Sequence, residues 1–152
     1  RYNRKGGFNV PFGSYKKPYF PEKEILAFSK KAQRAEFKCI GYEKAFEQIR
    51  TGDVIYCDPP YAPLSSTANF TAYHTNSFSQ EQQELLAKKA ESLMKKRIPV
   101  LISNHRTPLT EEWYKNAAET HIVKVRRSIS SNGGTRKKVD ELLALYRPPK
   151  TK

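Results

Sequence analysis

An uninterrupted apolar run at residues 54–57, followed at once by Asp58-Pro59-Pro60-Tyr61, constrains this chain most strongly. Such a run is typical of a parallel β-strand that is buried on both faces. In open α/β sheets, ligands bind beyond the carboxyl ends of the strands, which is where this tetrapeptide would lie. The sequence therefore predicts an α/β fold with a functional site directly after this strand.

The tetrapeptide itself is stiff and has few backbone donors. Each proline fixes its own φ angle and removes one N–H group, and the residue before a proline is pushed into an extended conformation. The Asp58 carboxylate and the Pro59 carbonyl can each accept a hydrogen from an exocyclic amine, while Tyr61 can stack on a ring. The segment suits a planar, amino-bearing substrate; a strand-ending turn with a capping aspartate is the structural alternative.

Elsewhere the periodicity alternates between helix and strand, as in an open α/β sheet. Helices are predicted after Pro21 to about residue 34, at 42–50, from the Ser79/Gln82 capping box past Met94, and after a Thr110 cap; strands are predicted at 37–40, 54–57, 99–103 and 121–130. Residues 140–145 have a helical composition, but they follow a strand and a Gly-rich turn at 132–134. That order favours an antiparallel hairpin return. Cys39 and Cys57 lie in apolar runs and are predicted to be buried, reduced thiols.

The charge balance points to a polyanionic partner. Lys and Arg number 28 against 15 Asp and Glu, so the net charge is +13. Nucleic acid or an anionic membrane surface would suit this charge, whereas the absence of an apolar run of about 18 residues excludes a membrane-spanning helix. Residues 1–20 are irregular and interleave aromatic with cationic side chains, which favours nucleic acid.

Four further features of the sequence are candidates for functional sites. His74, His105 and His121 lack the spacing of metal ligands, so we predict no metal site. Asn104-His105 could approach the tetrapeptide, although a strand-end turn is the favoured interpretation. The long loop at residues 62–77 suggests a lid or binding loop. Cations flank the predicted turn at residues 132–134 and could face phosphates: Arg126, Arg127, Arg136 and Lys137.

Several of these motifs together resemble the Dam-type DNA adenine methyltransferases. The resemblance spans nearly the whole chain and is carried by Asp58-Pro59-Pro60-Tyr61 after its strand, by Arg1-Tyr2-Asn3, by residues 8–13, 69–74 and 126–134, and by Ile102-Ser103-Asn104-His105. Enzymes of this family transfer a methyl group from S-adenosylmethionine to the adenine amino group of GATC in double-stranded DNA, without a metal. The resemblance implies a class I methyltransferase sheet, mostly parallel, with a C-terminal antiparallel hairpin.

The resemblance also implies roles for individual residues. Arg1 matches an arginine that reads a guanine, and Pro11 matches a proline that contacts a neighbouring base. Asn3 and Tyr15 match positions near the DNA backbone, where Lys16 adds a charge. Cys39, Ile40, Gly41 and Tyr42 match the stretch beside the cofactor's adenine, with Gly41 in place of a serine. Asp58 is expected both to contact the cofactor and to bind the reacting amine.

Part of the family's pattern lies outside this sequence. The family has a Phe-x-Gly-x-Gly cofactor loop and an acidic ribose ligand upstream of the tetrapeptide, and no Gly-x-Gly occurs here. We therefore expect residues 1–20 to end a target-recognition region and residues 21–152 to form the C-terminal part of a catalytic domain. Its expected partners are duplex DNA and a missing N-terminal segment of the same bacterial, cytoplasmic protein, with no membrane.

Two alternatives remain open at this stage. Alone, the chain would be a basic DNA-binding fragment without activity. It could also belong to an amino methyltransferase that acts on RNA or on protein glutamine. Those relatives more often carry Asn than Asp at position 58, and they would lack the match at residues 1–13.

Overall fold

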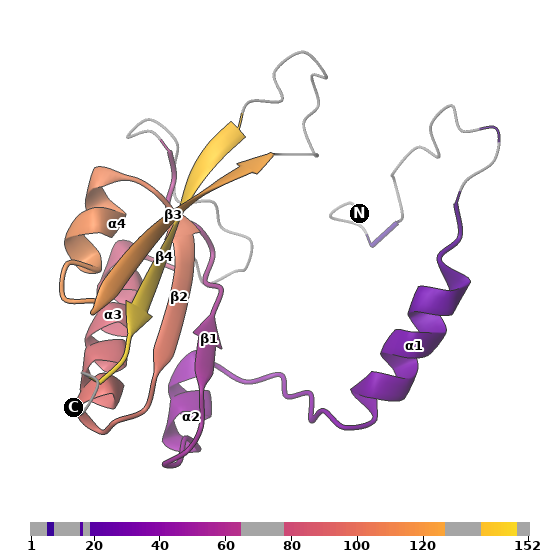
Figure 1. Cartoon of the computed structure of the whole chain (residues 1–152), viewed down its shortest axis with the longest axis horizontal. Coiled ribbons are helices and arrows are strands. Elements are labelled where there is room, and N and C mark those ends of the chain that lie inside the picture. The colour runs from indigo at the N-terminus through magenta and orange to yellow at the C-terminus, as the bar shows by residue number, and fades with distance from the viewer. Residues whose placement is uncertain (1–5, 8–15, 17–18, 65–77, 127–137, 149–152) are drawn as a thin grey trace. The chain divides into compact units, whose positions relative to one another are not determined.

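The structure is a computed structural model that describes residues 6–7, 16, 19–64, 78–126 and 138–148, with only the backbone of Arg126. The chain divides into two compact units, Arg1–Tyr42 and Glu43–Lys152. Figure 1 labels the helices and strands of both units.

In the first unit, helix α1 (Glu22–Ala32) confirms the helix predicted after Pro21. Acidic residues in its first turn and lysines in its last turn complement the helix dipole. No residue of α1 is buried, and its apolar side chains, Ile25, Leu26 and Phe28, are exposed.

The segment after α1 differs from the sequence prediction. Residues 37–40 form no strand, because they pair with no other strand among the described residues and stay in an irregular, exposed conformation. Cys39 is consequently exposed rather than buried. An apolar run alone does not make a strand, since its backbone groups also need a neighbouring strand for hydrogen bonding.

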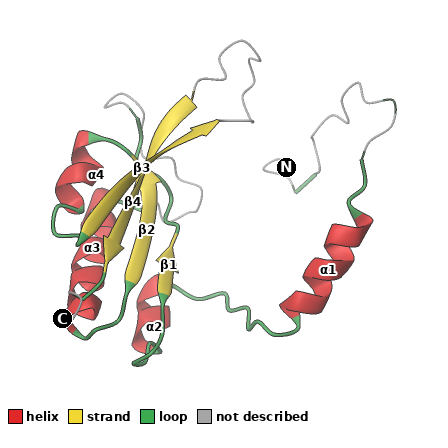
Figure 2. Ribbon diagram, in the orientation of Figure 1, coloured by secondary structure: helices red, strands yellow, loops and turns green. Residues whose placement is uncertain are grey.

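The described residues of the second unit form a four-stranded sheet with helices, which confirms the predicted α/β class (Figure 2). Its elements are α2 (Tyr42–Glu47, which begins at the unit boundary), β1 (Ile55–Cys57), α3 (Gln80–Lys95), β2 (Val100–His105), α4 (Pro108–Trp113), β3 (Glu119–Arg126) and β4 (Lys138–Tyr146). The strand order is β1-β2-β4-β3. β1 and β2 are parallel, whereas β4 is antiparallel to both β2 and β3. The C-terminal hairpin is therefore confirmed; its predicted turn lies outside the described residues.

The core forms where α3 and α4 pack on one side of the sheet (Figure 2). β4 alternates along its length, so that every second residue toward its end, Leu142, Ala144 and Tyr146, is buried. The helices contribute Leu86, Ala87, Ala90 and Leu93 from α3 and Trp113 from α4. This packing fixes β2, whose carboxyl end lies beside that of β1.

β1 is less buried than its apolar sequence predicts. It is an edge strand of the described sheet, paired only with β2. The Val54 and Tyr56 side chains, which share one face because strand side chains alternate, are 77% and 62% exposed. The prediction of burial on both faces is wrong for these described residues, since sequence alone cannot say what covers each face.

A turn precedes β1, and a capping residue marks the start of α4. Gly52 adopts a φ of +99°, which favours glycine, in the predicted turn before β1. Thr107, and not Thr110 as predicted, is the N-cap of α4. Thr107 precedes Pro108, which forces an extended conformation suited to an N-cap, while Thr110 completes the capping box.

We predict that Leu142→Ala lowers the free energy of unfolding by about 2–5 kcal/mol, because it leaves a cavity between the sheet and α4. Leu142 is only 2% exposed. Leu85→Ala is the matched control, since Leu85 is 41% exposed on α3 and should cost well under half as much. Urea unfolding followed by circular dichroism measures both, and equal losses would contradict this description of the core.

Candidate active site

The Asp58-Pro59-Pro60-Tyr61 segment begins where β1 ends, beside the carboxyl end of β2. Cys57 is paired with Ile102, so the next residues of the two parallel strands, Asp58 and Ser103, are neighbours. The Ser103 hydroxyl donates a hydrogen bond to Asp58 Oδ1 at 3.0 Å. The tetrapeptide therefore lies at the predicted edge of the sheet.

A short hydrogen-bond chain orients the Asp58 carboxylate. The Tyr56 hydroxyl lies 3.0 Å from Ser103 Oγ. Because a serine hydroxyl has one hydrogen, the bond to Asp58 makes Tyr56 the donor to Ser103. Asp58 itself is exposed, so its carboxylate is oriented from one side and open to an outside donor.

Tyr61 is held from two sides by side chains of β2 and β4. Its ring meets the His105 ring edge to face, with centroids 4.9 Å apart and an interplanar angle of 84°. Its hydroxyl donates to Glu141 Oε2 at 3.3 Å. Partial burial raises the pKa of Tyr61 to about 12, and the nearby charges of Glu141 and Asp58 act in the same direction. The phenol therefore keeps its proton at neutral pH.

Two side chains that the sequence analysis did not place in the site bind the backbone of this segment. Gln83 of α3 donates from Nε2 to the Pro60 carbonyl at 2.7 Å. Asn104 Oδ1 accepts from the Ala62 N–H at 2.8 Å. The favoured interpretation of Asn104-His105 as a strand-end turn is wrong, because both residues belong to β2. A signal for Gln83 existed, since it precedes Leu86 by three residues and so lies on the apolar side of α3.

The residues expected beside the cofactor's adenine lie mainly in the first unit. Cys39, Ile40 and Gly41 are exposed and irregular, and Tyr42 begins α2. Asp58 belongs to the second unit. The predicted cofactor site therefore draws on residues of both units, and the joint role of these residues stays a prediction.

Of the residues expected to contact DNA, the structure describes only two. Lys16 is exposed in the first unit. Arg126 ends β3, and its side chain is not described. The other predicted contacts lie outside the described residues: Arg1, Asn3, Pro11, Tyr15, Arg127, Arg136 and Lys137. Most of the predicted lid at residues 62–77 lies outside them as well.

The described histidines make ordinary polar contacts. His105 Nδ1 lies 2.7 Å from the Ala62 carbonyl, and His121 Nε2 lies 3.3 Å from Glu119. Within the described ranges, no three His, Cys, Asp or Glu side chains are grouped as metal ligands would be. No described helix is long and apolar enough to cross a membrane.

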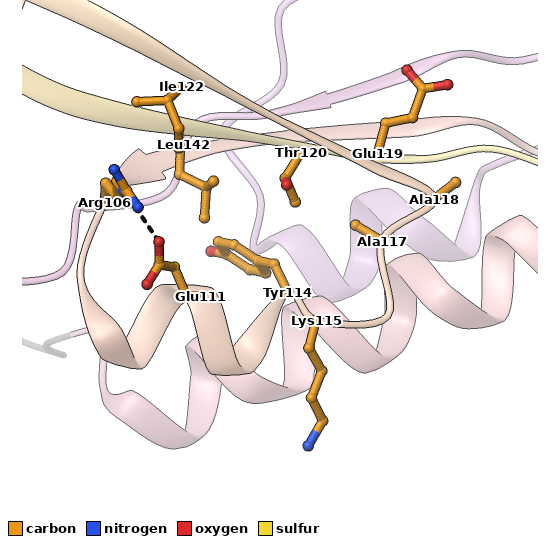
Figure 3. A pocket seen from close by; sticks show the side chains of 10 residues that line it. All are labelled: Arg106, Glu111, Tyr114, Lys115, Ala117, Ala118, Glu119, Thr120, Ile122 and Leu142. Carbon is orange, nitrogen blue, oxygen red and sulfur yellow. Dashed lines mark hydrogen bonds and ion pairs between the residues drawn. The ribbon is translucent and has the colours of Figure 1, made fainter.

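A cavity of about 350 Å³ lies between α4 and β3, and the tetrapeptide does not line it (Figure 3). Arg106 in its wall is paired with Glu111 at 2.7 Å. Glu119 in the opposite part of the wall is paired with Arg147. Because Arg106 and Glu119 already have charged partners, they are poorly placed to bind a charged ligand in this cavity. The tetrapeptide is therefore the better candidate for the active site.

Comparison with known proteins gives one consistent answer. The model of the D12 class N6 adenine-specific DNA methyltransferase family matches residues 1–129. The chain is 67% identical over 148 residues to the DNA adenine methylase of Escherichia coli K12, covering 97% of this chain and 53% of that protein. It is 59% identical to the enzyme of the same name from Serratia marcescens, covering 97% and 54%.

A third relative, from Vibrio cholerae, carries the same name and is 58% identical over 149 residues, with 97% of this chain and 53% of the relative covered. The chain thus spans about half the length of the curated relatives it matches. The family match extends over most of its residues, including the tetrapeptide. The chain belongs to the D12 class N6 adenine-specific DNA methyltransferase family.

Proposed function

We propose that a protein containing this chain, at the length of its relatives, methylates the exocyclic amino group of adenine in duplex DNA, at GATC, with S-adenosylmethionine as methyl donor. The observation that carries the proposal is the oriented, exposed Asp58 carboxylate at the carboxyl end of β1. Pro59 lies beside it, and no hydrogen bond from a described residue reaches the Pro59 carbonyl. These are two acceptors for the two hydrogens of one amine.

The chain's own residues would prepare the amine for transfer. An adenine must leave the base stack first, because its amino group is unreachable inside a duplex. Asp58 and the Pro59 carbonyl would then accept the two N–H hydrogens and localise the lone pair on nitrogen. Tyr61 would stack on the base. Proximity and fixed acceptors supply the rate enhancement, with no covalent enzyme intermediate.

The donor set of this chain fits the proposed cofactor. S-adenosylmethionine supplies a methyl group on a positively charged sulfonium, and an exposed carboxylate such as Asp58 suits a cationic partner. Cys39, Ile40 and Gly41 are exposed and outside any described strand, so their backbone is open to an adenine ring. Tyr42 would complete this side.

We also propose the division of labour within the longer protein. Residues 1–20 would end a target-recognition region, with Arg1, Asn3, Pro11, Tyr15 and Lys16 on the DNA. Residues 21–152 would complete the catalytic domain, and an N-terminal segment of the same protein would cover the exposed face of β1. The cations Arg126, Arg127, Arg136 and Lys137 would contact phosphates. A bacterial DNA substrate would place the protein in the cytoplasm, on the nucleoid.

The direct assay uses labelled S-adenosylmethionine with a GATC duplex and a duplex of the same composition without GATC. We expect N6-methyladenine in the nucleosides of the GATC duplex only. Label that appears in RNA or in protein glutamine instead would favour the alternative substrates.

We predict that Asp58→Ala lowers the rate of methyl transfer on the order of a hundredfold or more and leaves DNA affinity nearly unchanged, because it removes a charge-assisted acceptor at the reacting amine. Asp53→Ala is the control, since Asp53 lies before the opposite end of β1 and bonds only within its turn, to the Arg50 N–H at 2.7 Å. Single-turnover kinetics and filter binding measure the two quantities. A variant at position 58 with near-wild-type turnover would defeat the assignment.

Tyr61→Phe should retain much more activity than Tyr61→Ala, because stacking needs only the ring. Base–aromatic stacking contributes about 1–3 kcal/mol, so the alanine variant should bind the flipped base roughly 5- to 150-fold more weakly. Phenylalanine also loses the bond to Glu141, which makes it a test of the ring alone. Equal rates for both variants would refute a stacking role.

Arg1→Ala should relax the preference for one base pair of GATC and leave binding to unrelated duplexes little changed. An arginine that donates two hydrogen bonds to guanine contributes about 1–3 kcal/mol of discrimination. Competition binding with single-base variants of GATC measures this. Uniform weakening on every duplex would instead make Arg1 a phosphate contact.

A further inference from the structure

Three fully buried polar side chains, from three different elements, meet beneath the tetrapeptide. Gln83 lies on α3, Asn104 on β2 and Tyr114 at the end of α4, each with 0% exposure. Asn104 Nδ2 donates to the Tyr114 hydroxyl at 2.9 Å and to Gln83 Oε1 at 3.2 Å. The Tyr114 hydroxyl donates to the same Gln83 oxygen at 3.4 Å. We call these three residues the amide cluster.

The remaining polar atoms of the amide cluster bind the backbone of the site. Gln83 Nε2 donates to the Pro60 carbonyl at 2.7 Å, and Asn104 Oδ1 accepts from the Ala62 N–H at 2.8 Å. Asn104 Oδ1 also accepts from the His105 N–H at 2.9 Å. The two contacts with the segment after β1 lie on either side of Tyr61, so they fix the backbone on both sides of the proposed stacking ring.

Burying three polar side chains is costly unless each finds partners, and apolar residues would fill the same space more simply. Here the partners are largely the segment that carries the proposed chemistry. Tyr114 is held in turn by its burial and by its hydrogen bonds to Asn104 and Gln83, and its ring forms part of the wall of the cavity between α4 and β3 (Figure 3). Burial raises the pKa of Tyr114 to about 12, so its hydroxyl stays protonated and able to donate at neutral pH.

We propose that Gln83, Asn104 and Tyr114 are positioning residues for methyl transfer: they hold the Pro60 carbonyl and the Ala62 N–H so that the Pro59 carbonyl, Asp58 and Tyr61 keep their places around the amine. This inference rests on the proposed function. None of the three touches the substrate in this scheme. They act through the backbone of the tetrapeptide, where a displacement of about 1 Å can cost roughly a hundredfold in rate.

The first test measures the clamp itself, without catalysis. Pro59, Pro60 and Pro63 carry no N–H, and Asp58 becomes the free amino terminus of a peptide spanning residues 58–63, so this peptide reports amide hydrogen exchange only at Tyr61 and Ala62. In the full-length protein, Gln83→Met removes the donor to Pro60 and leaves Asn104, which holds the Ala62 N–H, in place. We expect exchange at Ala62 to quicken about five- to tenfold, the effect of losing one hydrogen bond from a cooperating cluster.

The second test measures the reaction. Gln83→Met should lower the single-turnover rate of methyl transfer about ten- to a hundredfold, while dissociation constants for DNA and for S-adenosylmethionine stay within about threefold, because no binding contact is removed. Tyr114→Phe removes one hydroxyl from the cluster and keeps the ring, so it should show both effects at smaller size. It carries both tests if the methionine variant does not fold.

Two controls separate positioning from general destabilisation. Gln80→Met makes the same substitution on the same helix at an exposed residue whose amide bonds only Glu84. Leu93→Ala weakens the buried side of α3 far along the helix from Gln83. We expect the first control to change nothing, and the second to lower the melting temperature while leaving the single-turnover rate and the Ala62 exchange rate near wild type.

The outcomes are distinct. Unchanged exchange at Ala62 in Gln83→Met and Tyr114→Phe overturns the clamp, and quickened exchange with a wild-type rate of transfer overturns its role in the reaction. A rate that falls equally in Leu93→Ala overturns it too. If the wild-type protein transfers no methyl group to adenine, the proposed function fails instead. Exchange at Ala62 then decides by itself whether the amide cluster holds the segment.

Discussion

The loss of backbone donors after β1 is the constraint on which the site depends. Pro59, Pro60 and Pro63 have no N–H, so the chain cannot continue the hydrogen-bond ladder that holds β1 to β2. A segment that carries the proposed reacting carboxylate still has to be held. Side chains from α3 and β2 replace the missing ladder, and the buried packing of α3, α4 and β4 keeps those side chains in place. Gln83 and Asn104 therefore belong both to the buried core and to the support of the proposed active site.

Local sequence patterns predict where the candidate site lies, but they do not predict the side chains that support it. The apolar run and the two prolines that follow it are local signals. The run predicts a strand, and the prolines predict where the strand ends. Gln83 and Ser103 reach the segment through pairing and packing between residues far apart in the chain, which no local pattern encodes. The sequence places Asn104 near the end of a strand, but it does not show whether the side chain binds the segment. That contact depends on β2 extending through His105, which keeps Asn104 within the sheet.

The errors in the sequence analysis have a common physical origin. The predictions for residues 37–40 and for the strand at residues 54–57 both rest on apolar composition. Apolar side chains tend to be buried, but composition does not show which part of the protein buries them. In the described residues, Cys39 is exposed, as are Val54, directly before β1, and Tyr56 within it. The C-terminal strand β4 was predicted correctly against its helical composition, because the preceding strand and glycine-rich turn specified a hairpin. Context outweighed propensity there, as it commonly does in sheets.

The central claim is that Asp58 and the Pro59 carbonyl receive the two hydrogens of one adenine amino group. A crystal structure of the full-length protein with a GATC duplex and a non-reactive cofactor analogue tests it most directly. The account predicts an adenine outside the stack, with N6 about 2.7–3.2 Å from both a carboxylate oxygen of Asp58 and the carbonyl oxygen of Pro59, and with its ring against Tyr61. An extruded adenine whose amino group is bound by other residues, with Asp58 turned away, would contradict it.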